Sequence, residues 1–182
     1  METARELFVH ELADMLDGEK KLVEALSQLS EQSQNKDVKK GFEQHRQQTE
    51  EQVSRIEQIF EELGESPDST ECKGIRGLIE EQKSIEEEHP SPEILDVFNL
   101  GAAQKVESYE MRAYESLISL AQELGLRRAS QLLTRTLKEE EQTLKRLQTL
   151  SRKIKPSQTG MAGEEEEEVT AGRRAKKGRR VA

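Results

Sequence analysis

Residues 19–29 read EKKLVEALSQL, and residues 110–120 read EMRAYESLISL. The same gapless shift of 91 positions that joins these stretches also lays EEQVSRI (50–56) on EQTLKRL (141–147). Unrelated amphipathic hairpins can share such matches by chance, but a duplicated helical hairpin explains their order and spacing better. In the first pair of stretches the identical positions are Glu19 and Glu110, Glu24 and Glu115, Leu26 and Leu117, and Leu29 and Leu120.

Apolar residues recur at three- and four-residue steps over four long segments, which is the period of a helix with one buried face. The pattern predicts helices over 3–30, from the polar break at 33–37 to Gly64, over 93–124 and over 126–154. A glycine such as Gly64 ends a helix because it adopts the left-handed conformation at little cost. Helices of this length, each about 42 Å at a rise of about 1.5 Å per residue, have the proportions of a four-helix bundle.

A shorter segment, residues 72–88, separates the two hairpins and carries apolar residues of its own. We expect a short helical crossover here, weakened by Gly74 and Gly77. The next helix has a start signal in Ser91, a suitable N-cap, followed by Pro92 at the first helical position. The chain is therefore predicted to be all-α, with two helical hairpins and a long crossover that give a four-helix bundle of ferritin-like connectivity.

The composition agrees with one helical domain. Of the 182 residues, 36% are charged, 32% are hydrophobic and 3% are aromatic, which argues against a β-sandwich or barrel. No run approaches the ~18 apolar residues of a membrane span, and the N-terminus is unlike a signal peptide, so we expect a soluble, cytoplasmic protein without membrane contact. The single cysteine, Cys72, excludes an intramolecular disulfide and a CxxC zinc site, and we expect it to be inert.

The charge divides the chain into a body and a tail. Residues 1–155, the expected bundle domain, carry 32 acidic and 22 basic side chains, a net charge of −10 that disfavours a duplex-binding surface. Residues 156–182 contain five glutamates at 164–168 followed by six basic residues, and almost nothing apolar. We expect this tail to be disordered. Its basic block can make weak contacts with nucleic acid, but we favour a solvated, solubilising role.

Carboxylates interrupt the apolar stripes at corresponding places. On the first and third long helices the only polar positions of the stripe are Glu19 and Glu110, which the 91-residue shift relates. Glu140 lies on the stripe of the last helix, and Glu107 lies one turn before Glu110. The second long helix carries His45 on the same kind of stripe. All four helices therefore direct a polar group toward the expected core.

Two interpretations of these carboxylates stay open at this point. Carboxylates pointing into one bundle centre need protonation, a cationic partner or a metal, and carboxylate with imidazole is a ligand set that iron and manganese accept. Alternatively, the carboxylates lie at the edge of the stripe and reach solvent or pair with Lys20, Lys21 and Arg112. For His45 we favour a hydrogen-bonded core histidine over a metal ligand.

Several segments, taken in order and spacing, resemble the YciE/YciF family of ferritin-like bacterial proteins. They are FEQHRQQTEEQVSRIEQIF (42–60), CKGIRGLIEEQ (72–82) and AAQKVESYEMRAYESLISLAQELG (102–125), together with stretches near 7–29 and 132–147. The resemblance covers roughly residues 5–153. It implies a rubrerythrin-like four-helix bundle that forms a homodimer, in a family associated with stress responses.

The resemblance also implies site residues. Glu19, Glu107 and Glu110 match glutamates of the family, and Glu140 lies in the acidic cluster of the last helix. The sequence departs from some relatives at HRQQTE (45–50) and at Ser108, where relatives carry further Glu and His residues, so a full pair of Glu-x-x-His motifs is absent.

Two functions compete on this basis. The first is a ferritin-like stress-response protein that binds iron or manganese, as a mononuclear or dinuclear site, through Glu19, Glu107, Glu110, Glu140 and His45. The second is a metal-free helical scaffold that dimerises and binds partners. The absence of a P-loop, a GxGxxG motif and a nucleophile elbow gives no support to kinase, dinucleotide-dependent or hydrolase chemistry.

Overall fold

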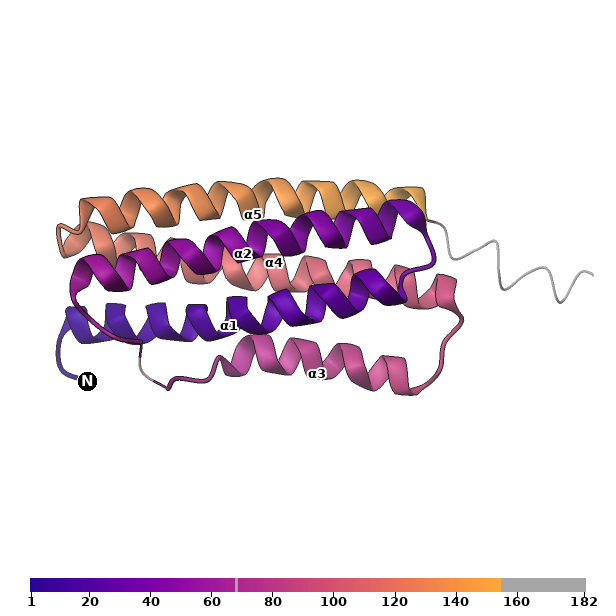
Figure 1. The fold of residues 1–182 in the computed structure, drawn as a ribbon, viewed down its shortest axis with the longest axis horizontal. Helices are drawn as coiled ribbons and strands as arrows, with labels where there is room; N and C mark the ends of the chain where they lie inside the picture. The colour runs from indigo at the N-terminus through magenta and orange to yellow at the C-terminus, as the bar shows by residue number, and fades with distance from the viewer. Residues whose placement is uncertain (68, 155–182) are drawn as a thin grey trace, which may run out of the picture.

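The computed structural model describes residues 1–67 and 69–154, and these form five α-helices and no strand. The predicted all-α bundle of two hairpins with a helical crossover is confirmed (Figure 1). The expected tail at 156–182 lies outside the described residues. The helices are α1 (Ala4–Gln32), α2 (Lys36–Leu63), α3 (Lys73–Glu87), α4 (Pro92–Glu123) and α5 (Arg127–Lys153).

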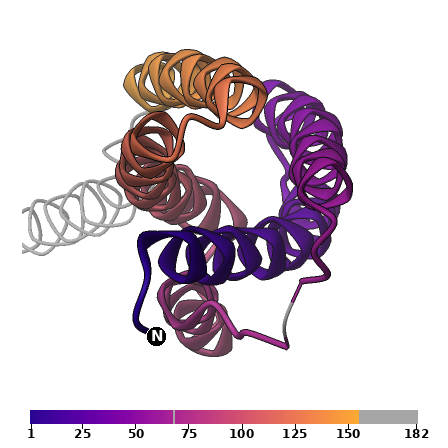
Figure 2. The same cartoon turned by 90° about the vertical axis from the view of Figure 1, so that its left-hand side faces the viewer.

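The helices α1, α2, α4 and α5 surround one axis, as the view along the bundle shows (Figure 2). Each hairpin, α1 with α2 and α4 with α5, packs closely, and the two hairpins meet along α1·α4 and α2·α5. The crossover helix α3 lies outside the four and packs on α1 and α4. None of the helices in the described ranges combines the length and apolar character that crossing a membrane requires.

The helix ends follow the start and stop signals in the sequence. Thr3 and Glu6 form a reciprocal capping box at the start of α1, and the Asn35 side chain accepts from the backbone at the start of α2. Ser91 caps α4 as expected, with Pro92 in its first turn. Gly64 ends α2 with a φ of 67°, in the left-handed region that a glycine enters without strain.

The core consists of two apolar clusters with a polar layer between them. On α1, for example, Glu19 lies between Leu16 of one cluster and Leu22 of the other. The same order holds on the other three helices of the bundle, so the polar residues form a layer about halfway along it. The buried polar side chains of this layer are Glu19, His45, Thr49, Gln52, Glu107, Glu110, Thr136, Glu140 and Thr143.

The crossover helix is held by a close approach at a glycine. A Cβ on Gly74 would lie 2.5 Å from the ring of Tyr109 on α4, far inside van der Waals contact. Cys72 and Ile75 are fully buried at the same junction, and the Cys72 thiol lies 3.6 Å from the Tyr109 hydroxyl. Burial raises the pKa of the Cys72 thiol to about 11, which agrees with an unreactive cysteine.

Substitution of Gly74 by alanine therefore tests how α3 is attached. We expect Gly74→Ala to lower the free energy of unfolding by about 1–3 kcal/mol, because the methyl group displaces the Tyr109 ring. The matched control is Gly77→Ala in the same helix, where a Cβ meets nothing within 4 Å. The control is expected to be neutral or to stabilise by up to about 1 kcal/mol through helix propensity. Urea unfolding followed by circular dichroism measures both, and equal effects of the two substitutions would contradict the close approach.

Candidate metal centre

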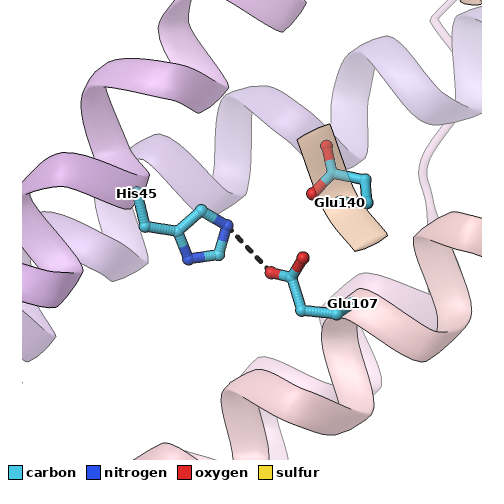
Figure 3. A group of neighbouring side chains, drawn as sticks. All are labelled: His45, Glu107 and Glu140. Atoms are coloured by element: carbon cyan, nitrogen blue, oxygen red, sulfur yellow. Dashed lines mark ion pairs between the residues drawn. The ribbon is translucent and has the colours of Figure 1, made fainter. Parts of the chain in front are cut away.

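Three side chains from three helices meet in the polar layer. His45 of α2, Glu107 of α4 and Glu140 of α5 each offer a ligand atom, and these atoms all lie within 4.8 Å of one another. Figure 3 shows the three side chains directed toward a common point. All three are buried, with exposed fractions of 5%, 0% and 0%. The arrangement brings together two carboxylates and one imidazole out of contact with bulk water.

The polar atoms of this group lack the partners that burial normally requires. His45 Nε2 lies 2.9 Å from Glu107 Oε1, but the contact does not have the alignment of a hydrogen bond. Within the described ranges both Glu107 oxygens, Glu140 Oε2 and His45 Nδ1 have no hydrogen-bond partner. Such orphaned buried atoms are rare in proteins and call for a bound water, an ion or a catalytic role as explanation.

The other two predicted ligands lie in the same layer but outside this group of three. Glu19 is fully buried and accepts a hydrogen bond from the Tyr114 hydroxyl, while its Oε2 has no partner among the described residues. Glu110 is 1% exposed. The pair related by the 91-residue shift is thus buried at one level, although its two members do not complete the group formed by His45, Glu107 and Glu140.

The interpretation that places the carboxylates at the edge of the stripe is wrong, because the expected cations pair elsewhere. The Lys20 ammonium lies 2.7 Å from Glu57, and Lys21 pairs with Asp17. The Arg112 guanidinium lies 2.6 Å from Glu115. None of these three cations pairs with a carboxylate of the polar layer, whose glutamates are at most 1% exposed.

Neighbouring residues that the sequence interpretation did not assign to the site hold the layer in place. Gln52 donates a hydrogen bond to Glu140 Oε1. Arg55, only 8% exposed, donates to the Thr136 hydroxyl at 3.0 Å and to Glu139 at 2.6 Å. The spacing could have indicated that Arg55 belongs to the layer, since it follows Gln52 by three residues on the stripe of α2. Its partners could not be predicted in this way, because they are more than 80 positions away in the sequence.

Burial governs the protonation of the layer. Desolvation raises the pKa of Glu107 to about 8, and it raises the pKa values of Glu19, Glu110 and Glu140 well above the usual range, with mutual repulsion adding to the shift. Desolvation also lowers the pKa of His45 to about 4, so its imidazole is neutral near pH 7. A neutral imidazole presents one lone pair, which is the form that binds a metal.

The residues present could hold a divalent metal ion. Two ligands at right angles around an ion at about 2.1 Å lie about 3 Å apart, close to the separation of His45 Nε2 and Glu107 Oε1. An ion also supplies the positive charge that buried carboxylates need in order to ionise. Carboxylate oxygens and an imidazole nitrogen are donors that divalent metal ions accept.

A four-helix bundle of two hairpins joined by one long crossover has the connectivity of the ferritin-like class. The chain belongs to the DUF892 family (Domain of unknown function), whose model matches residues 3–159. The resemblance to the YciE/YciF family is thereby confirmed, since the chain is 38% identical to Protein YciF of Escherichia coli (strain K12) over 144 residues. That match covers 79% of this chain and 87% of the relative.

Solved structures support the same assignment. The crystal structure of the E. coli stress protein YciF is 37% identical and superposes with a TM-score of 0.79, covering 83% of this chain and 96% of that chain. The protein YcfI from Rhodopseudomonas palustris is 34% identical with a TM-score of 0.78, over 81% and 94% of the two chains. A Xanthomonas campestris protein, 20% identical with a TM-score of 0.69 over 84% and 93%, shares the fold.

The raised pKa of Glu107 predicts a pH-dependent stability for the metal-stripped protein. Folded Glu107 holds a proton up to about pH 8, whereas an unfolded glutamate loses it near 4.5, so stability falls as the pH rises through this window. His45 opposes this trend only below its ordinary value of 6.5. Between pH 6.5 and 8 we therefore expect a loss of about 1–2 kcal/mol from Glu107, at about 1.4 kcal/mol per proton and pH unit.

Glu107→Gln removes this titration, and its stability is expected to depend less steeply on pH. The measurement is urea unfolding of the metal-stripped chain at a series of pH values, with the exposed Glu115→Gln on the same helix as control. A slope for Glu107→Gln as steep as that of the control would show that Glu107 is not the group that titrates.

Proposed function

We propose that the chain is a ferritin-like stress-response protein that binds iron or manganese inside its helical bundle. The single observation that carries the proposal is the buried group of His45, Glu107 and Glu140, whose ligand atoms lie within 4.8 Å of one another. The relationship to YciF, whose crystal structure is described as that of a stress protein, supports the assignment to stress responses.

The energetics of the layer favour a cation. Four carboxyl groups that share one buried layer remain protonated in the absence of a partner, at the cost of oxygens without hydrogen bonds. An ion replaces the protons, allows the carboxylates to ionise and occupies the unpaired oxygens in one step. The binding is expected to strengthen with pH because ion and protons compete for the same atoms.

The chain's residues divide into two sets for this role. His45 Nε2 and one oxygen each of Glu107 and Glu140 would hold the ion, with Gln52 orienting Glu140 through its hydrogen bond. Glu19 of α1 and Glu110 of α4 are further buried carboxylates for the same ion or for a second one. A bound iron or manganese ion supplies Lewis acidity and redox chemistry. The homodimer and the cytoplasmic location belong to this proposal.

Metal analysis tests the proposal directly. The full chain is stripped of metal, loaded with Fe(II) without oxygen or with Mn(II), desalted, and analysed by plasma mass spectrometry. We expect at least one ion per chain, with Glu107→Gln and Glu140→Gln weakening binding by about tenfold or more, since even residues that only support ligands cost about 10–100-fold. Glu115→Gln, an exposed glutamate of α4, is expected to bind as the wild type does.

The control separates an internal site from surface binding. Metal lost equally in Glu115→Gln and Glu107→Gln would mean that exposed carboxylates hold the ion. A wild-type chain that retains neither metal after loading would overturn the proposal and favour the metal-free, dimerising scaffold, for which sedimentation of the stripped protein gives the oligomeric state.

A further inference from the structure

A cavity of about 500 Å³ opens on the surface between α2 and α5. Its floor includes His45 of the polar layer and the apolar side chains Leu147 and Leu150. We call it the α2–α5 groove. Its volume lies in the range of pockets that hold small molecules. His45 therefore lies at the boundary between the groove and the candidate metal centre, with its Nδ1 buried beneath the groove surface.

The groove is cationic although the body of the protein is acidic. Four basic residues line it, Lys40, Lys145, Arg146 and Lys153, against one acidic residue, Asp37. In the part of the chain that the structure describes, none of these four basic residues forms an ion pair. Most arginines outside the groove do form one. Unpaired cations gathered around a concave surface attract anions and concentrate them there.

Arg146 is fixed in position within the groove. Its Nη2 donates to Gln48 Oε1 and to the Thr143 hydroxyl, both at 2.9 Å. A guanidinium held in this way retains further N–H groups for a ligand and loses little conformational entropy when it binds one. The groove thus contains a preorganised donor beside three lysine ammonium groups.

His45 supplies the second, independent sign of a ligand. The residue is 95% buried, and its Nδ1 has no hydrogen-bond partner among the described residues. Figure 3 shows Nδ1 on the side of the ring turned away from Glu107 and Glu140. When the Nε2 lone pair faces Glu107 and the centre, the proton of the neutral imidazole resides on Nδ1 and makes it a donor.

We propose that the α2–α5 groove binds a small multivalent oxyanion, a phosphate or a polycarboxylate. One oxygen of the anion accepts a hydrogen bond from His45 Nδ1, and its other oxygens pair with Arg146 and the surrounding lysines. Leu147 and Leu150 leave room for an organic portion of the ligand. The histidines that bind metals almost always donate their second N–H to an acceptor, and the groove ligand is the acceptor that the protein itself does not provide.

The proposal deepens the proposed function. Only the coupling between anion and metal rests on that function. An acceptor at Nδ1 holds the tautomer that presents Nε2 to the centre and makes the imidazole a stronger ligand. Anion and metal are then expected to strengthen each other's binding by the same factor. The anion site itself is a property of the metal-free chain.

Imidazole NMR of the metal-stripped full chain tests the anion site. The chain has only three histidines, so the His45 nitrogen signals can be assigned and followed during titration with inorganic phosphate, citrate or acetate. We expect saturable shifts of His45 Nδ1 with phosphate or citrate and none with monovalent acetate at equal ionic strength. The stronger of the two ligands identifies the phosphate or polycarboxylate class.

Two substitutions make the test specific. Arg146→Gln is expected to weaken the binding at least fivefold, whereas Lys138→Gln, which removes an exposed cation of α5 outside the groove, leaves it unchanged. Equal losses in both variants would indicate general charge attraction and overturn the site. So would an unresponsive His45, or Arg146→Gln binding as the wild type does. Because the anion titration uses the metal-stripped chain, its failure leaves the metal proposal intact. In the same way, failure of metal loading leaves the anion site intact.

Discussion

The burial of carboxyl groups in one layer of the bundle is the constraint on which the rest of the structure depends. Glu107 and Glu140 are fully buried, and an uncompensated buried charge costs several kcal/mol even after relaxation. The chain meets this cost partly with raised pKa values and partly with Tyr114 and Gln52, which donate to Glu19 and Glu140. The apolar clusters on both sides stabilise the fold sufficiently to tolerate such a layer.

The two halves of the molecule use related residues differently. Glu19 and Glu110 are related by the repeat, yet Tyr114 donates to Glu19 while no such donor serves Glu110 among the described residues. Glu107 has no glutamate counterpart on α1, since the shift places it opposite Leu16. The centre is therefore asymmetric with respect to the two hairpins, because its three converging ligand atoms come from α2, α4 and α5 and none comes from α1.

Periodicity was sufficient to predict the helices and the polar layer, because helix faces are determined by local spacing, and residue identity predicted the boundaries at Gly64 and Ser91. It could not decide that Glu107, not Glu110, meets His45, because a difference of three residues on α4 depends on how that helix is rotated against its neighbours. It also missed Arg55 and Arg146, which read as ordinary surface cations in the sequence. Their positions depend on the packing of α2 against α5, two helices that lie far apart in the sequence.

The two apolar clusters also decide how material reaches the middle of the molecule. A hydrated ion cannot travel along the bundle axis past Phe8 and Leu12 at one end or Phe42 and Leu100 at the other, all of which are at most 1% exposed. For the proposed metal site, exchange with solution would therefore be lateral, from the α2–α5 groove past His45. Such exchange would require the rotation of a few side chains, a far faster process than the separation of helices.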